Sequence, residues 1–115
     1  MPDRIQLSRR AGWRLPPRSM SVARPHRWGN PFRIGHGADG RIEVRDSHGK
    51  TRAHALTMPE ARRTAVALYR ESLTPETAAQ VRADLAGLNL ACWCPPDDAC
   101  HADVLLELAN GAPSC

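Results

Sequence analysis

Residues 88–109 constrain the fold most, because they combine an apolar run, a turn-rich loop and an amphipathic segment. Residues 88–92 are almost entirely apolar, which is typical of a short strand buried in a sheet. Two prolines and two aspartates follow and predict a loop. Residues 102–109 then place their apolar side chains on one face of a helix, which Asn110 and Gly111 end. A strand that leads through a loop into a helix favours an α/β fold.

The first half of the chain contains further strand candidates. Residues 5–7 lie within a basic N-terminal segment, residues 1–18, and residues 19–23 alternate small and apolar side chains. Residues 41–55 predict a β-hairpin around a turn at residues 46–49. Because both arms of this hairpin are largely polar, we expect it to lie at the periphery.

Two helices are predicted between the hairpin and the apolar run. Thr57 and Glu60 form the pattern of a capping box, with the threonine at the N-cap and the glutamate three residues later. Thr74 precedes Pro75, and a proline is well suited to the first helical position because its missing N–H needs no partner there. Gly87 is placed to end this second helix.

These elements together predict one α/β domain over residues 1–115. A chain of 115 residues is long enough for a single core but not for two. We expect a Rossmann-like sheet of about four short strands in a two-layer or three-layer arrangement. Three helices and the peripheral hairpin complete the predicted architecture.

Charge is distributed unevenly along the chain. Residues 1–52 contain twelve basic and four acidic residues, a formal charge of +8, whereas residues 53–115 contain four and eight, a formal charge of −4. A basic half of this strength predicts a partner that carries phosphates, either a nucleotide or nucleic acid. The alternative is an arginine-rich surface that is merely solvated.

No part of the sequence predicts membrane insertion. No apolar run approaches the roughly 20 residues that span a bilayer, and the N-terminus lacks the apolar region of a signal peptide. We therefore expect a cytoplasmic protein, whose thiols stay reduced. Free thiols or a metal site are then favoured over disulfides.

The cysteine-rich loop has three chemical interpretations, of which a zinc site is the first. Cys92, Cys94, Cys100 and His101 supply the ligand types of a tetrahedral zinc site. The spacing is imperfect, because the first pair is closer than in a C-x₂-C motif and Cys100 and His101 are adjacent. A site with three protein ligands and one open position, the catalytic arrangement, would fit this spacing more easily.

The second interpretation is a reactive thiolate at the start of the last helix. Cys100 would be the nucleophile, His101 the base and Asp103 an acid that orients the base. The third interpretation is structural, because free cysteine often behaves as a small buried apolar residue. Cys92 would then belong only to the core, and Trp93 would only pack.

A second loop, which follows the strand predicted at residues 19–23, predicts a ligand-binding site. Gly29 would let a phosphate or sugar approach backbone N–H groups, Asn30 would hydrogen-bond a base or ribose, and Pro31 fixes the backbone. Arg24 would neutralise a phosphate, and Trp28 would be an exposed aromatic ring that stacks a base. The alternative is a rigid turn without a ligand.

Both loops follow predicted strands, so we expect them to face one another. In α/β folds ligands gather at the carboxyl ends of strands, where loops meet helix N-termini. This arrangement would place residues 24–30 near Cys94, Cys100 and His101. Cys94 would thus contact the ligand as well as a metal ion.

The two loops also carry a resemblance to a known family. The motifs RPHRWGNPF at residues 24–32 and CWCP with CH at residues 92–101 resemble a small family of bacterial and phage proteins catalogued as a domain of unknown function, family 4326. The resemblance extends over residues 19–110. It implies a compact, stand-alone cytoplasmic α/β domain and no settled activity, and the hairpin at residues 41–55 looks like an addition.

The sequence therefore predicts a small cytoplasmic domain that binds a nucleotide, nucleoside or nucleic acid between the two loops. One hypothesis is a hydrolase or transferase that acts on a nucleoside or nucleotide. The alternative is a non-enzymatic, zinc-stabilised module that binds nucleic acid. A closed four-ligand zinc site would favour the module.

Overall fold

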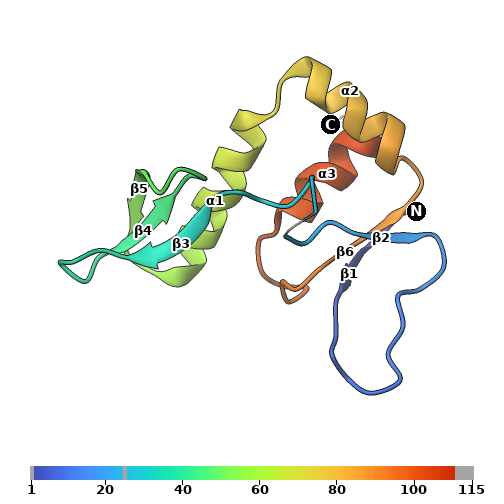
Figure 1. Cartoon of the computed structure of the whole chain (residues 1–115), viewed down its shortest axis with the longest axis horizontal. Helices are drawn as coiled ribbons and strands as arrows, with labels where there is room; N and C mark the ends of the chain where they lie inside the picture. The colour runs from blue at the N-terminus through green and yellow to red at the C-terminus, as the bar shows by residue number, and fades with distance from the viewer. Residues whose placement is uncertain (1, 25, 111–115) are drawn as a thin grey trace.

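The apolar run before the cysteine-rich loop forms β6 (Asn89–Cys92), the central strand of a parallel sheet. The computed structural model describes residues 2–24 and 26–110, and Figure 1 shows its helices and strands. On its two sides β6 pairs in parallel with β1 (Arg4–Gln6) and β2 (Ser19–Ser21). A strand between two others contacts neighbours along both edges, which explains why the most apolar of the three is central.

The carboxyl ends of these three strands meet at one edge of the sheet. The pairing continues just beyond the strands, where the Leu7 N–H donates to the Cys92 carbonyl and the Val22 N–H donates to the Ala91 carbonyl, both at 2.8 Å. This edge is the origin of the cysteine-rich loop after β6 and of the loop at residues 24–32. The parallel sheet thus brings together two loops that are far apart in the sequence.

Three helices cover the two sheets: α1 (Met58–Ser72), α2 (Pro75–Leu85) and α3 (His101–Asn110). The predicted threonine caps of α1 and α2 are confirmed, since each side chain accepts a hydrogen bond from the backbone three residues later. Helix α3 packs against β6 and β1, and α2 packs against α3 (Figure 1). Gly111, predicted to end α3, lies outside the described residues. None of the described helices is long and apolar enough to cross a membrane.

A second, antiparallel sheet contains β3 (Arg33–His36), β4 (Ile42–Arg45) and β5 (Thr51–Ala55) in that order. Helix α1 packs against all three strands and also contacts α3, so it joins the two halves of the molecule. Val44 and Ala55 are buried on the helix-facing side of this sheet.

The α/β class and the three helices are confirmed, but the strands are arranged differently from the prediction. In place of one sheet of about four strands with a peripheral hairpin, the described residues form two sheets of three. The hairpin predicted at residues 41–55 pairs with β3, which the sequence does not predict because Gly35 and Gly37 are typical of turns. The hairpin also contributes the fully buried Val44 to the core, so its inner face is not peripheral.

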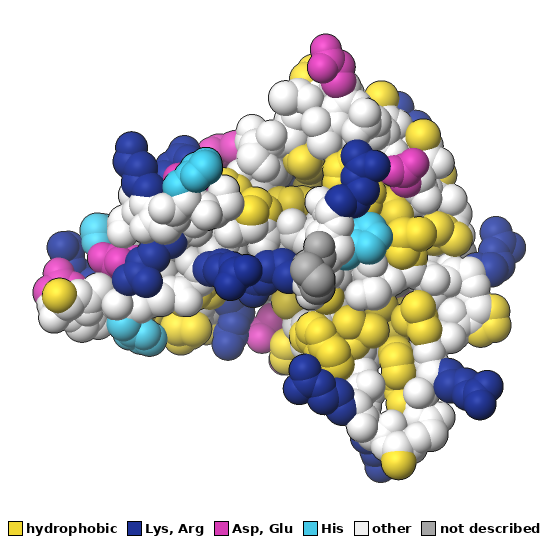
Figure 2. All heavy atoms as spheres, viewed as in Figure 1, with side chains coloured by type: hydrophobic (Ala, Val, Ile, Leu, Met, Phe, Trp, Pro, Cys, Tyr) yellow, Lys and Arg dark blue, Asp and Glu magenta, His cyan; other side chains and the backbone are white. Residues whose placement is uncertain are grey.

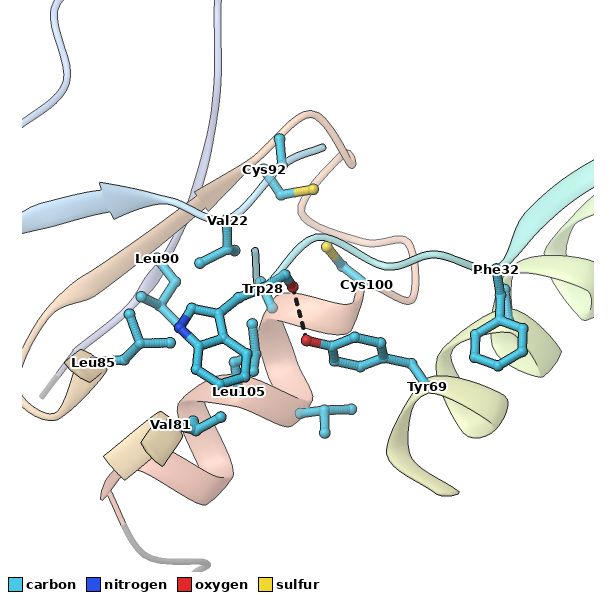
Figure 3. Packing of buried hydrophobic residues seen from close by; sticks show 14 of the residues in the cluster. Val22, Trp28, Phe32, Tyr69, Val81, Leu85, Leu90, Cys92, Cys100 and Leu105 are labelled. Atoms are coloured by element: carbon cyan, nitrogen blue, oxygen red, sulfur yellow. Dashed lines mark hydrogen bonds between the residues drawn. The ribbon is translucent and has the colours of Figure 1, made fainter. Parts of the chain in front are cut away.

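One buried core connects the two sheets, and the loop between β2 and β3 forms part of it. Figure 3 shows the Trp28 indole of this loop beside Leu85 of α2, Leu90 of β6 and Leu105 of α3. The hydroxyl of Tyr69, from α1, donates a 2.7 Å hydrogen bond to the Trp28 carbonyl oxygen. The loop is therefore held to the core by packing and by a buried hydrogen bond.

Candidate metal centre

Three cysteine sulfurs gather where β6 ends and α3 begins. Cys92 is the last residue of β6, Cys94 follows two residues later, and Cys100 immediately precedes α3. Their sulfur atoms all lie within 4.8 Å of one another, with 3.8 Å between those of Cys92 and Cys94. Zinc–sulfur bonds of about 2.3 Å in a tetrahedron place two sulfurs about 3.8 Å apart. The three thiols are therefore close enough together to hold a metal ion.

His101 lies beside this cluster, in the first turn of α3, and is 5% exposed. Its Nε2 atom is 2.8 Å from the Val22 carbonyl oxygen, and its Nδ1 atom is 3.8 Å from the Cys100 sulfur. A carbonyl only accepts hydrogen bonds, so Nε2 carries a proton and Nδ1 of a neutral ring is left with a free lone pair. Histidines that bind metals commonly have one nitrogen fixed in this way. His101 nevertheless lies outside the group of three mutually close ligand atoms.

The close contact between the thiols perturbs their acidity. Hydrogen bonds from Cys100 and then Cys94 hold the pKa of Cys92 well below its ordinary value, despite burial. The pKa of Cys100 is raised, because its hydrogen bonds to Cys92 and Cys94 and its burial all favour the protonated form. The cluster therefore favours one negative charge among its three thiols, stabilised by hydrogen bonds from the other two. Negative charge held in this way attracts a cation.

Arg4, on β1, fixes the loop that carries these cysteines. Its guanidinium donates to the carbonyl oxygens of Pro95 and Asp98, each at 2.9 Å, and to that of Pro96. It also forms an ion pair with Asp103 at 3.0 Å, and its side chain is 10% exposed. The sequence does not single out Arg4, because one arginine in a basic segment carries no local sign of partners 91 to 99 residues away.

The two predicted loops line one cleft, with a volume of about 790 Å³. Its lining includes Arg24 and Asn30 from one loop and Cys92, Cys94, Cys100 and His101 from the other. The contact follows from the parallel sheet, since β2 and β6 are neighbours and end at the same edge. The geometry therefore brings the cysteines and the loop at residues 24–32 together.

The expected exposure of Trp28 is wrong. This residue is 4% exposed and belongs to the core, and the guanidinium of Arg27 lies 4.5 Å from its ring centroid. Apolar neighbours from β6 and from two helices enclose the indole, so its faces are not available to stack a base.

Asn30 and Gly29 hold the loop in shape. The Asn30 amide donates to the Ala65 carbonyl of α1 at 3.2 Å, and its side-chain oxygen accepts from the Phe32 N–H at 2.9 Å. A Cβ atom on Gly29 would lie 3.0 Å from the Arg24 Cα. The glycine therefore allows the backbone at residue 29 to lie close to the backbone at residue 24. These contacts favour the rigid-turn alternative for both residues.

Gly29 and Pro31 line a second cleft, of about 600 Å³, rather than the one beside the cysteines. Arg24 and Arg33 line both clefts, and Arg45 lines only the second. Figure 2 shows basic side chains gathered where the antiparallel sheet meets the rest of the molecule. The surface between the two sheets is therefore rich in arginine.

The predicted role of Asp103 as the acid that orients His101 is not supported. Its carboxylate is exposed and pairs with Arg4, whereas the His101 nitrogens contact the Val22 carbonyl and the Cys100 sulfur. Asp103 is also not among the residues that line the cleft. Its structural role is to complete the set of groups that anchor Arg4.

The fold and the site define a small α/β domain with a cluster of three cysteines at the carboxyl edge of a parallel sheet. The chain belongs to the family described as domain of unknown function DUF4326, whose model matches residues 5–111. Comparison with curated proteins and with solved structures gave no match.

Proposed function

We propose that this protein is a zinc-stabilised domain that binds nucleic acid. Cys92, Cys94, Cys100 and His101 would hold the zinc ion, and the arginine-rich surface would contact phosphates. The observation that carries the proposal is the group of three sulfurs within 4.8 Å, with His101 held beside it.

Distances and chemistry both support zinc. A tetrahedral ion with one nitrogen ligand requires a sulfur–nitrogen separation of about 3.6 Å, and His101 Nδ1 lies 3.8 Å from the Cys100 sulfur. A movement of the His101 ring toward the other two sulfurs would complete a set of four soft or borderline ligands around one ion. The predicted cytoplasmic location would keep the thiols reduced and able to bind it.

Charge supports a nucleic-acid partner. The first 52 residues carry a formal charge of +8. Arg24 and Arg33 line both clefts, and no carboxylate of the described residues lies within 4.0 Å of either guanidinium. Arg24 donates to the Asn30 carbonyl oxygen at 3.1 Å, and guanidinium groups without a carboxylate partner are the usual partners of phosphate oxygens.

An enzyme that acts on a nucleoside or nucleotide, a hydrolase or transferase, is the second candidate. It is favoured by one observation, namely that all three cysteines line the cleft. If His101 is not a ligand, the fourth position of the ion could face the cleft and hold a water molecule. The burial of Cys100, which is 1% exposed, and of His101 favours the stabilising role instead.

Metal content of variants tests the proposal. Elemental analysis of protein purified under reducing conditions should give one equivalent of zinc per chain, and Cys94→Ser should lose it. Cys115→Ser is the matched control, because the proposal gives this fourth cysteine, which lies outside the described residues, no role as a ligand, and the variant should retain zinc.

The same measurement on His101→Ala separates the two candidates. Loss of zinc together with loss of folding would indicate a closed four-ligand site, as we propose. Retention of zinc with an intact fold would favour the open, catalytic arrangement. Wild-type protein without zinc would overturn both.

A further inference from the structure

Trp93 lies between two metal-site cysteines and is the most exposed of the tryptophans. Its side chain is 44% exposed, and the Arg9 guanidinium lies 4.7 Å from its ring centroid. The Cys92 and Cys94 sulfurs lie 3.8 Å apart within the cluster, whereas the tryptophan between them remains accessible to solvent. A metal ion bound there would fix the backbone on both sides of the indole.

The indole shares its cleft with cations from the opposite loop. Trp93, Arg24 and Arg33 all line the cleft of about 790 Å³. A third arginine of the lining, Arg62, is already paired with Asp98 at 3.3 Å. The cleft therefore offers an aromatic face together with two guanidinium groups that lack a carboxylate partner among the described residues.

This combination matches the chemistry of an unpaired nucleotide. A nucleobase has a flat face that stacks on an aromatic ring, and its phosphates pair with arginine. Bases within a duplex are stacked on one another and are not free to lie against a side chain. An exposed indole is therefore of use for a single strand, whereas arginines alone would serve either form.

We propose that this cleft binds a single-stranded nucleic acid, with one base stacked on Trp93 and the adjoining phosphates held by Arg24 and Arg33. The proposal rests on the proposed function, because it requires that the protein binds nucleic acid. Beyond that function, the proposal specifies that the nucleic acid is single-stranded and that Trp93 is the residue that contacts a base. The base lies on the face of the indole that Arg9 does not cover.

Binding of labelled oligonucleotides, measured by fluorescence anisotropy, tests the proposal. The probes are oligo-dT and oligo-U of the same length, a DNA duplex, and an abasic strand of equal charge. Trp93→Ala should weaken binding to single strands by about 5- to 150-fold, the loss expected for one stacked base, and Trp93→Phe should restore most of it. The abasic strand should bind Trp93→Ala and the wild type alike.

Salt dependence separates stacking from charge. Arg33→Gln should reduce the slope of log affinity against log salt by about 0.7, the value for one phosphate contact on a single strand. Trp93→Ala should leave that slope unchanged. The matched control is Arg63→Gln, which removes an exposed arginine of α1 that does not line the cleft, and its slope should equal that of the wild type. Zinc content and thermal unfolding of each variant verify the fold.

The outcomes distinguish this proposal from the function on which it rests. If duplex and single strands bind equally well, or if Trp93→Ala binds as tightly as the wild type, the single-strand proposal is overturned while nucleic-acid binding stands. If no oligonucleotide binds at all, the proposed function itself fails.

Discussion

Arg4 determines the shape of the cysteine-rich loop more than any residue within the loop. A largely buried guanidinium must satisfy its donors, and here three loop carbonyls and the Asp103 carboxylate accept from them. The loop forms one turn of its own, in which the Asp98 N–H donates to the Pro95 carbonyl oxygen at 3.0 Å, and its two consecutive prolines supply no further N–H donors. Arg4 therefore adds external donors to the single internal hydrogen bond of the loop.

Replacement of Arg4 should weaken metal binding without removing a ligand. We expect Arg4→Met to lower zinc affinity by about 10- to 100-fold, as for other groups that position metal ligands. Arg4→Lys should have an intermediate effect, because an ammonium keeps the charge but cannot present donors over the width of a guanidinium. Competition with a chromophoric chelator measures these affinities.

The control for this experiment is Arg10→Met, which removes an exposed arginine from the same basic segment. Its zinc affinity should equal that of the wild type. Unchanged zinc affinity in Arg4→Met would show that the loop keeps its shape without the anchor.

The helix caps and the central strand can be predicted from the sequence, whereas β3 cannot. The helix caps are local, since a threonine followed by a proline or a glutamate specifies its own hydrogen bond, and both are confirmed. The central strand is also evident, because only a strand with neighbours on both edges needs residues as apolar as Leu90 and Ala91. β3 could not be predicted, because Gly35 within it and Gly37 just after it indicate turns and its pairing with β4 is a tertiary contact.

Glu43 joins the strands of the antiparallel sheet through its carboxylate. It accepts hydrogen bonds from Arg45 at 2.8 and 3.0 Å and from the Thr51 hydroxyl at 3.2 Å, and it lies 3.5 Å from His54. These partners, Arg45 first, lower the pKa of Glu43 from its usual value of 4.5. A lowered pKa stabilises the folded state above pH 4.5, and this stabilisation is lost as the pH falls through the folded-state value.

Acid should therefore weaken the contribution of Glu43 selectively. At pH 7 the free energy of unfolding should be higher for the wild type than for Glu43→Gln, and the difference should shrink as the pH falls toward 3. Urea denaturation at a series of pH values measures it. The control is Glu71→Gln, whose carboxylate forms no ion pair with the described residues. A difference that stays constant with pH would contradict the assigned role of Glu43.

For the molecule as a whole, the sequence predicts which loops meet but not which side chains are exposed. The sequence predicts that the two loops face one another, because the carboxyl ends of parallel strands meet at one edge of a sheet. The exposure of each tryptophan could not be predicted, because it depends on tertiary contacts: Trp28 follows Arg27 in the sequence yet is 4% exposed, whereas Trp93 stands between two cysteines and is 44% exposed. Residues of β6, α2 and α3 enclose Trp28, whereas Trp93 lies in the loop after β6 and stays exposed.

If the proposed zinc ion is bound, its removal should unfold the two sheets together. A structural zinc ion contributes about 10–16 kcal/mol at neutral pH, which matches or exceeds the roughly 5–15 kcal/mol of a typical domain. Cys92 ends β6 and Cys100 begins the turn into α3, so loss of the ion releases the centre of the parallel sheet. The core is continuous through Tyr69 to α1 and the antiparallel sheet, so the disruption should spread.

Hydrogen exchange during titration with a chelator tests this expectation. Backbone amides of β6 and β4 should lose protection at the same chelator concentration, because one cooperative unit contains both. Excess zinc should restore both. Protection that persists in β4 after it is lost in β6 would show that the antiparallel sheet and α1 fold independently of the metal centre.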